Sequence, residues 1–217
     1  MPLIFYLAAA AGAYLLGSIP FGYLLVRIFH KEDIREKGSG NIGATNVMRS
    51  GGKGLGATTF ILDVSKGYLA VALCGMYAVH AGLGADVRGN GLAIAALFVV
   101  LGHIYTMWLG FKGGKGVAAA FGVFLALALW PALIALASFV VTFTLSRYVS
   151  LGSIVAAVAF PVLAVLMPHG PRTPAETAVL FAIPAIVILR HHGNIARLAS
   201  GTEYRFGRNK EAGTTTV

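Results

Sequence analysis

The sequence predicts an all-α integral membrane protein with seven transmembrane helices, an N-terminus outside the membrane and a cytoplasmic C-terminus. Of its 217 residues, 57% are apolar and only 12% are charged, whereas soluble domains carry about 25% charged residues. The mean hydropathy is +0.79, and long apolar segments alternate with short polar ones. A water-soluble domain of this length could not cover so much apolar surface, so we expect lipid to surround the chain.

The first predicted span covers residues 3–26 and carries no charged side chain. It lacks the basic start of a secretory signal peptide, so we expect a retained helix. Gly17-Ser18-Ile19-Pro20 interrupts this span and predicts a kink, because proline cannot donate a helical hydrogen bond. The polar segment 27–53 follows, with six basic and three acidic residues.

Further apolar segments predict spans at 54–79, 92–109, 151–167 and 175–189. A short glycine-rich loop with Asp86 and Arg88 separates the second span from the third. A proline-rich loop, 168–174, precedes the last span.

The remaining apolar segment, 117–146, is too long for one crossing of about 20 residues. We interpret it as two short helices that turn at Trp130-Pro131. A single crossing would place the basic segment that starts at Arg190 opposite the basic residues of 27–53. Two crossings bring both to the cytoplasmic side, as the positive-inside rule favours.

We expect residues 1–217 to form a single transmembrane domain whose last residues, 209–217, are disordered. The net charge is +9, and cytoplasmic loops account for most of it, because basic residues mark the loops that stay inside the cell. The predicted external loops contain one basic residue each, Arg88 and Arg172. The single cysteine, Cys74, excludes an intrachain disulfide framework.

Residues 38–49 have the composition of a phosphate-binding loop. Their glycines allow the backbone to turn back and direct successive N–H groups to one point. Short neutral side chains add hydrogen-bonding groups, and an arginine adds a planar cation. The candidate ligands are Gly38, Ser39, Gly40, Asn41, Gly43, Thr45, Asn46 and Arg49. A tight glycine turn without a ligand is the alternative, but the density of polar and basic groups favours a phosphate site.

Residues 111–116 resemble a P-loop but lack two of its features. Leu109 stands where that motif needs glycine, and Gly116 stands where it needs serine or threonine. The remaining pattern predicts a glycine turn that opens a helix at Val117. The N–H groups and the dipole of such a helix suit an anion. The residues concerned are Lys112, Gly113, Gly114, Lys115 and Gly116.

Two further polar clusters lie at 150–153 and 190–197. Ser153 stands at the predicted start of a span, where a helix N-cap and an anion ligand remain alternatives. His191 and His192 border the basic segment near the end of the chain, and we expect at least one of them to contact substrate.

Three ionisable side chains fall inside predicted spans. Asp63 and Lys66 share one helix face, and a functional intramembrane pair and a structural ion pair remain alternatives. We predict that His103 is a hydrogen-bonded packing residue. No group of histidine, cysteine and carboxylate residues has metal-ligand spacing, so no metal site is expected. No histidine has an acid five residues later, and Ser39 lacks a relay partner, so the sequence offers no general base.

The polar clusters resemble the motifs of a known family, the bacterial acyl-phosphate-dependent glycerol-3-phosphate acyltransferases. The similarity covers residues 14–206. Its motifs are GSGNIGATNVMR at 38–49, GHIYTMWLGFKGGKGV at 102–117, SLGSI at 150–154 and RHHGNIARLASGTE at 190–203. The resemblance implies a multi-pass enzyme of the bacterial inner membrane that catalyses the first step of phospholipid synthesis. It would transfer an acyl chain from acyl phosphate to the sn-1 hydroxyl of glycerol 3-phosphate, giving lysophosphatidic acid and phosphate.

The resemblance also implies roles for individual residues. The catalytic positions would be Ser39, Arg49, Lys115, Ser153, His191 and Asn194. Glu203 would support the structure. The family is thought to need no protein base, because the phosphate of its substrate accepts the hydroxyl proton, and no cofactor is expected. One departure from the family pattern is Tyr105-Thr106, where an aromatic residue followed by proline is expected.

The expected partners are the two substrates and the lipid bilayer, with no nucleic acid. We expect a monomer whose active site faces the cytoplasm. The competing class is a membrane transporter of phosphate or another small anion. Such transporters usually place their site near the bilayer midplane, between repeats. The predicted clusters gather at one face, and seven spans do not divide into two equal repeats, so the acyltransferase is favoured.

Overall fold

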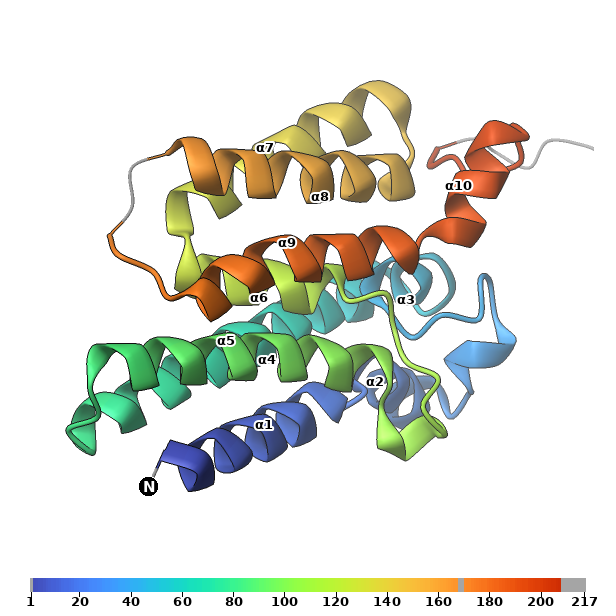
Figure 1. Cartoon of the computed structure of the whole chain (residues 1–217). Coiled ribbons are helices and arrows are strands. Elements are labelled where there is room, and N and C mark those ends of the chain that lie inside the picture. Colours follow the sequence, from blue (N-terminus) through green and yellow to red (C-terminus); the bar gives the residue numbers. More distant parts are fainter. Residues whose placement is uncertain (1, 168–169, 208–217) are drawn as a thin grey trace, which may run out of the picture.

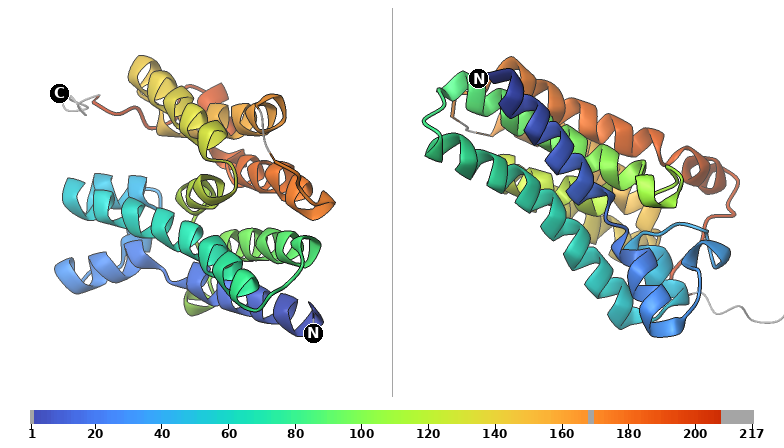
Figure 2. Two further views of the ribbon diagram at one scale, coloured as in Figure 1. Left: turned by 90° about the vertical axis from the view of Figure 1, so that its left-hand side faces the viewer. Right: turned by 90° about the horizontal axis from the view of Figure 1, so that it is seen from below.

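The computed structural model describes residues 2–167 and 170–207, and every regular element in those residues is a helix. Long helices form a bundle in which consecutive members alternate in direction (Figures 1 and 2). The members are α1 (Pro2–Ser18), α4 (Lys53–His80), α5 (Ala85–Ile104), α6 (Val117–Leu127), α7 (Leu129–Ser146), α8 (Val149–Leu166) and α9 (Pro174–Leu189). The predicted all-helical fold class is therefore confirmed for the described residues.

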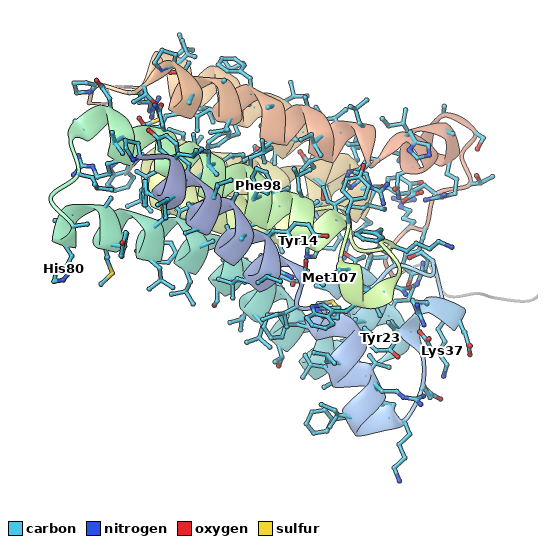
Figure 3. The ribbon with its side chains drawn as sticks, turned by 60° about the horizontal axis from the view of Figure 1, so that its bottom comes forward. Tyr14, Tyr23, Lys37, His80, Phe98 and Met107 are labelled. Atoms are coloured by element: carbon cyan, nitrogen blue, oxygen red, sulfur yellow. The ribbon has the colours of Figure 1, made fainter. Side chains whose placement is uncertain are left out.

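Short helices gather at one end of the bundle, which we call the motif end (Figure 1). They are α2 (Phe21–His30), η1 (Ile34–Glu36), α3 (Ala44–Ser50), η2 (Met107–Leu109) and α10 (His192–Ala199). Figure 3 shows Tyr23 and Lys37 at the motif end and His80 at the opposite end. The four polar clusters of the sequence all lie at the motif end (Figure 1), as the sequence predicts.

Several segments are long and apolar enough to cross a bilayer. Within the described residues, five segments pass this test, namely Pro2–His30, Lys53–His80, Ala85–Leu109, Leu129–Ser146 and Val149–Leu166. A sixth is formed if α9 and α10, which meet at 54°, are taken as one bent span. The α6 helix is apolar but only 11 residues long. An integral membrane fold follows from these segments, whereas the count of seven crossings remains a prediction.

The predicted kink in the first span is a break between two helices. The α1 helix ends at Ser18 and α2 begins at Phe21, after Pro20. The buried Lys66 ammonium donates to the Ile19 carbonyl at this break (2.8 Å), and so supplies a donor where the helical pattern fails. The α2 helix continues to His30, so the start of the polar segment is helical rather than a loop.

The predicted start of the third span is wrong. The α5 helix begins at Ala85, so Asp86 and Arg88 lie in its first turns instead of in a loop. Gly84 precedes it in an extended conformation, and the negative charge of Asp86 suits a helix N-terminus. At the other end, α5 stops at Ile104, and the span continues through η2 to Leu109, the predicted end.

The apolar segment 117–146 forms two helices, as predicted, but the break lies at Ala128 rather than at Trp130-Pro131. Ala128 has φ −154° and ψ 71°, which no helix accommodates. Pro131 instead lies in the first turn of α7. There its missing N–H has no helical acceptor to lose, so the proline follows the break instead of forming it.

The bundle core depends on small residues at helix crossings. A Cβ atom at Gly67 of α4 would collide with the Ala119 carbonyl of α6, and one at Gly122 would collide with the Val64 carbonyl. Such close backbone approach replaces the hydrophobic driving force that is lacking between helices in lipid.

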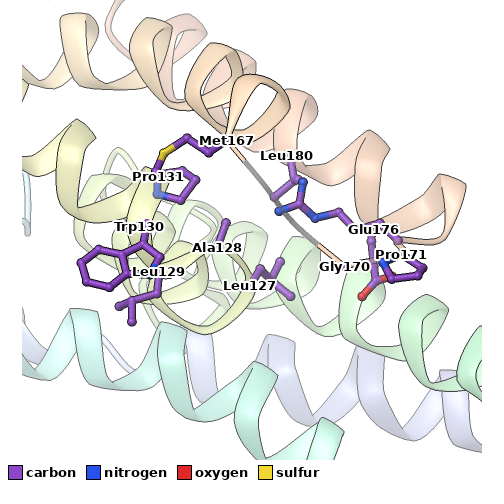
Figure 4. A pocket seen from close by; sticks show the side chains of 11 residues that line it. Leu127, Ala128, Leu129, Trp130, Pro131, Met167, Gly170, Pro171, Glu176 and Leu180 are labelled. Carbon is purple, nitrogen blue, oxygen red and sulfur yellow. The ribbon is translucent and has the colours of Figure 1, made fainter.

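A cavity of about 300 Å³ lies at the end opposite the motif end (Figure 4). It is lined by the break between α6 and α7, by Met167, and by residues around the start of α9. The Arg172 guanidinium there donates to the Ala164 carbonyl (2.9 Å). The cavity holds none of the predicted site residues, so it is not part of the candidate site. The predicted disordered segment 209–217 lies outside the described residues.

Candidate active site

Asn46 organises the loop 38–49 that the sequence indicates as a phosphate site. Its side chain is buried, and its carboxamide oxygen accepts from Ser39 N (2.9 Å) and from the Arg49 guanidinium (3.0 Å). Its carboxamide nitrogen lies within hydrogen-bond distance of three backbone carbonyls, those of Ile34 (3.2 Å), Lys37 (3.0 Å) and Asn41 (2.8 Å). Both polar atoms of Asn46 therefore bond the protein itself and fix the loop conformation.

Two glycines of this loop are needed for its backbone. Gly38 and Gly40 have φ values of +58° and +70°, in the left-handed region that favours glycine. Gly43 instead precedes α3 in an extended conformation, and its N–H donates to the Asn41 side chain (2.8 Å). The side chains of Ser39 and Thr45 are exposed at the motif end. The loop thus turns as predicted and leaves these two hydroxyl groups accessible.

The loop 111–116 differs from the predicted anion site in one respect. Gly113 N donates to the Ile104 carbonyl, and Gly114 N donates to the His103 carbonyl, both at 3.0 Å. These two amides hold the loop against the end of α5, so the prediction that they are free for an anion is wrong. The predicted opening of α6 at Val117 is confirmed, with Gly116 as its N-cap at φ +88°.

Lys115 is the basic side chain that links this loop to the rest of the site. Its ammonium donates to the Asn194 side-chain oxygen (2.5 Å), whereas Lys112 is exposed. Burial lowers the pKa of Lys115 to about 8; the nearby charges of Arg197, Arg190 and Arg49 act in the same direction, and the charge of Glu203 opposes them. The site is therefore rich in positive charge before any substrate binds.

Glu203 connects three segments at the motif end. One carboxylate oxygen accepts from Ser150 Oγ (2.8 Å) and from the Asn194 amide (2.6 Å), and the other accepts from Arg197 Nε (2.7 Å). Burial raises the pKa of Glu203, but these hydrogen bonds and the charge of Arg197 together lower it below its ordinary value. The contacts join α8, α10 and the segment after α10, which agrees with the supporting role implied for Glu203.

The segment after α10 also contacts the first motif. The Arg49 guanidinium lies over the Tyr204 ring, 4.6 Å from its centroid. Phe206 N donates to the Arg147 carbonyl (3.0 Å), which fixes the segment against the α7–α8 turn. All four polar clusters are thus joined through residues 194–206. Ser150 belongs to a predicted polar cluster but received no role of its own from the sequence, and Tyr204 belongs to none of the four clusters.

His191 is buried at the start of α10. Its Nδ1 donates to the Val187 carbonyl (2.7 Å), because a carbonyl oxygen can only accept. Burial lowers the pKa of His191 to about 4; the Val187 hydrogen bond opposes this, and the charge of Lys115 adds to it. The imidazole is therefore neutral near pH 7, with the proton on Nδ1 and a lone pair on Nε2.

Ser153 is not the N-cap of a helix. The α8 helix begins at Val149 with Tyr148 as its N-cap, and Ser153 lies one turn inside it. The Ser153 hydroxyl donates to the Val149 carbonyl (2.9 Å). The N-cap alternative is therefore wrong, because the helix starts two residues earlier than predicted.

The intramembrane charges Asp63 and Lys66 form an ion pair (2.7 Å) that is almost fully buried. His103 Nδ1 lies 3.5 Å from the same Asp63 oxygen, too far for a normal hydrogen bond. The other side of the His103 ring packs against Gly114, where a Cβ atom would collide with Nε2. His103 is thus a packing residue as predicted, but the expected hydrogen bond is not formed at Nδ1.

Thr106, at the position that departs from the family pattern, makes a specific contact. Its hydroxyl donates to the Ser18 carbonyl at the end of α1 (2.5 Å). The neighbouring Tyr105 accepts at its carbonyl from the Tyr14 hydroxyl (2.7 Å), and its ring lies below the Arg190 guanidinium (5.5 Å). The departure therefore ties this turn to α1 by a hydroxyl group that proline lacks.

The sequence of this chain is similar over nearly its whole length to known proteins of one family. Residues 7–201 match the family model described as glycerol-3-phosphate acyltransferase. The chain is 46% identical to a glycerol-3-phosphate acyltransferase of Brucella anthropi over 93% of each sequence. It is 43% identical to one of Rhodospirillum rubrum, over 98% of this chain and 96% of the relative.

The fold is also similar to a solved structure of an integral membrane glycerol 3-phosphate acyltransferase, PlsY, in its glycerol 3-phosphate form. The TM-score is 0.82 at 40% identity, over 93% of this chain and 96% of that one. The lysophosphatidic acid form gives a TM-score of 0.79. These relatives favour an enzyme over an anion transporter. The chain belongs to the glycerol-3-phosphate acyltransferase family and is a membrane acyltransferase of that family.

Proposed function

We propose that this protein transfers an acyl chain from acyl phosphate to the sn-1 hydroxyl of glycerol 3-phosphate. The products are lysophosphatidic acid and phosphate. The observation that carries the proposal is the convergence of the four motifs at one place. Hydrogen bonds join Lys115, Asn194, Glu203 and Ser150, and the first motif meets them where Arg49 stacks on Tyr204. The name of the family and the glycerol 3-phosphate form of the solved relative support the choice of acceptor.

The charge of the site suits two phosphate groups. Lys115 lies within electrostatic reach of Arg49, Arg190 and Arg197, and Glu203 opposes them with one negative charge. Both proposed substrates carry a phosphate, and each phosphate would neutralise part of this excess. Arg49 offers a planar fork for bidentate contact, whereas Lys115 acts as a compact charge.

The exposed groups around the cations would position the substrates. The hydroxyls of Ser39 and Thr45 and the side chains of Asn41 and Lys112 are at least partly accessible at the motif end. The loop glycines would bring backbone N–H groups close to a phosphate, although Gly113 and Gly114 contribute shape instead. Ser153 and Asn194 would fix the side of the site formed by α8 and α10.

The chemical step needs no protein base. The sn-1 oxygen attacks the acyl carbonyl carbon, the bond from that carbon to the phosphate oxygen breaks, and inorganic phosphate leaves. The hydroxyl proton passes to the phosphate dianion of glycerol 3-phosphate, whose second pKa is about 6. The dianion is tethered to the reacting hydroxyl, which supplies proximity. The cations stabilise negative charge as it grows on the carbonyl and the leaving group.

The proposed setting is the bacterial inner membrane, crossed seven times, with the motif end in the cytoplasm. Basic residues concentrate at the motif end, in accord with the positive-inside rule. Single cysteines at Arg88 and Arg172 should react with an impermeant thiol reagent from outside, and one at Lys31 should react only from inside. A cysteine at Arg205 that reacts from outside would overturn this orientation. We propose that the functional unit is a monomer.

The function is tested with purified protein in detergent or vesicles. Acyl phosphate and glycerol 3-phosphate should give lysophosphatidic acid, and phospholipase treatment should place the chain at sn-1. The matched donor control is the corresponding acyl thioester, which lacks the phosphate leaving group. Transfer from the thioester at an equal rate, or acylation at sn-2, would contradict the donor or the position proposed. Uptake of phosphate into protein-containing vesicles without acyl transfer would favour the transporter.

A further inference from the structure

The Arg49 side chain is held from two directions. One guanidinium nitrogen donates in the plane of the group to the Asn46 oxygen (3.0 Å). The face of the group lies over the Tyr204 ring, with its central carbon 4.6 Å from the ring centroid. The in-plane bond and the stacking contact restrain different movements, so together they leave the guanidinium little freedom.

The Tyr204 ring is itself fixed by its neighbours. Phe206 meets it edge-to-face at 5.2 Å, and Phe206 in turn meets Phe143 of α7 edge-to-face at 5.7 Å. On the other side, Glu203 is anchored by hydrogen bonds from α8 and α10. The ring is thus part of a segment that is fixed before and after it.

Burial of apolar surface is only partial at this position. Tyr204 remains 44% exposed, so leaving water stabilises its placement less than it would stabilise a fully buried ring. Its notable contact is with a cation that the proposed function assigns to substrate phosphate. An aromatic face attracts a guanidinium by the ring quadrupole, and this attraction depends on the ring rather than on the phenol hydroxyl.

We propose that Tyr204 is a positioning residue for the phosphate site, which holds Arg49 in the orientation that receives the phosphate of glycerol 3-phosphate. The inference rests on the proposed function of Arg49. An unrestrained arginine samples many rotamers, and binding must then restrict it. Tyr204 removes part of that cost before substrate arrives. It touches no reacting atom in this scheme and acts through Arg49.

The first test compares ring and non-ring substitutions. Tyr204→Leu should raise the KM for glycerol 3-phosphate about 3- to 30-fold, the range expected for losing a cation–π contact, while kcat changes within about twofold. Tyr204→Phe should retain the wild-type KM because it keeps the ring. The matched control is Tyr77→Leu, which removes an exposed ring that stacks on Phe5 near the end of α4 opposite the motif end, and it should leave KM unchanged. Equal harm from Tyr204→Phe and Tyr204→Leu would overturn the proposal.

The second test separates positioning from general stability. The Kd for glycerol 3-phosphate is measured by calorimetry in wild-type protein and in Arg49→Ala, each with and without Tyr204→Leu. A positioning role predicts that Tyr204→Leu weakens binding only when Arg49 is present. The same loss in both backgrounds would show that Tyr204 acts without Arg49, and the inference would fail. Because binding is measured directly, this result stands apart from the acyl-transfer assay; glycerol 3-phosphate bound without acyl transfer would contradict the proposed function alone.

Discussion

Lys115 donates a hydrogen bond to Asn194, a residue 79 positions later in the chain (2.5 Å). The contact joins the loop that opens α6 to the first turn of α10. Through Asn194 and Glu203 it also reaches Ser150 of α8. The bond therefore links the titratable Lys115 ammonium to the segments that we expect to hold substrate. Because the charge of Lys115 should affect substrate binding, its titration should be visible in the pH dependence of activity.

The first prediction concerns this charge. Burial, assisted by Arg197, Arg190 and Arg49 and opposed by Glu203, lowers the pKa of Lys115 to about 8. Substrate phosphate requires the charged form, so kcat/KM for glycerol 3-phosphate should fall as the pH rises above about 8, since kcat/KM reports groups of the free enzyme. A bound phosphate favours the charged ammonium, so the alkaline limb of kcat should lie at higher pH.

The contribution of Lys115 to the free energy of unfolding should rise with pH, whereas kcat/KM should fall. Folding lowers the pKa of Lys115 from 10.5 to about 8, so the unfolded chain binds more protons between these values. The contribution of Lys115 to stability therefore rises with pH across that window. Lys115→Arg stays charged, and its kcat/KM should lack the limb near pH 8. A limb that persists in Lys115→Arg would assign it to another group.

The second prediction concerns the fork of Arg49. Removing a charge-assisted contact costs about 1.5–3 kcal/mol, equivalent to roughly 10- to 150-fold in binding. Arg49→Lys should be nearly as harmful as Arg49→Ala, because an ammonium cannot reproduce bidentate contact or the stacking on Tyr204. The measurement is KM for glycerol 3-phosphate in both variants. Full activity in Arg49→Lys would exclude the bidentate role.

The third prediction concerns Glu203. Its side chain is only 8% exposed and accepts hydrogen bonds from three residues, so Glu203→Gln should destabilise the fold by about 1–3 kcal/mol. For a chain of this size, each kcal/mol lowers Tm by about 2–4 °C. The control is Glu32→Gln, whose pair with Lys37 is 41% exposed on both sides and should contribute little. Lost activity with unchanged Tm would place Glu203 in the chemistry instead of the scaffold.

The hydrogen bonds and the ion pair of Glu203 also predict how stability depends on acidic pH. Hydrogen bonds and the charge of Arg197 outweigh burial and lower the pKa of Glu203 below 4.5. Its contribution to stability is therefore present above about pH 4.5 and is lost as the pH falls through the lower folded-state pKa. Glu203→Gln should lose that part of the acid dependence.

The sequence predicts the helices of this fold better than their ends. Apolar length alone locates α4 to within one residue at each end, because a bilayer-spanning helix needs a continuous apolar segment. Hydropathy does not locate the start of α5, because the first turns of this helix carry Asp86 and Arg88 and therefore resemble a loop. The break at Ala128 has no local signal, since the nearby proline lies in the next helix.

The candidate site shows the same division. Arg49 and Lys115 can be selected from residue type and spacing, whereas Asn194 is indicated by the resemblance to a known family. The sequence does not show which of these side chains bond other protein groups and which remain available to substrate, because this depends on contacts between distant segments. Asn46 is a predicted phosphate ligand, but its side chain bonds the loop around it. Tyr204 lies in none of the four polar clusters, yet it contacts Arg49.

The fourth prediction concerns the buried ion pair of Asp63 and Lys66. Removing one partner leaves an uncompensated charge in the bundle, so Asp63→Leu alone and Lys66→Met alone should each cost about 3–5 kcal/mol. The double variant Asp63→Leu/Lys66→Met leaves no charge and should be more stable than either single variant. Lys66→Met also removes the donor to the Ile19 carbonyl, so part of its cost should remain. Thermal unfolding in detergent measures all three. A double variant less stable than both single ones would contradict a structural pair.

The fifth prediction concerns the proton acceptor. His191 is buried three residues before Asn194 of the candidate site, and its Nε2 carries a lone pair. It is therefore the strongest protein candidate for a base. Its pKa is lowered to about 4, chiefly by burial, which makes it a weak base at neutral pH. The glycerol 3-phosphate dianion, with a second pKa of about 6, is the stronger acceptor. We therefore expect the acidic limb of kcat near pH 6, not near pH 4.

A phosphonate analogue of glycerol 3-phosphate, whose second pKa is higher, separates the two acceptors. If the substrate accepts the proton, the acidic limb of kcat moves upward with the analogue and persists in His191→Ala, which weakens substrate binding. His191→Asn is the matched variant, because its carboxamide can still form hydrogen bonds but cannot titrate. A limb that stays fixed with the analogue and disappears in both variants would identify His191 as the base. The cations of Arg49 and Lys115 would keep their proposed role in either case, because they bind substrate phosphate rather than move a proton.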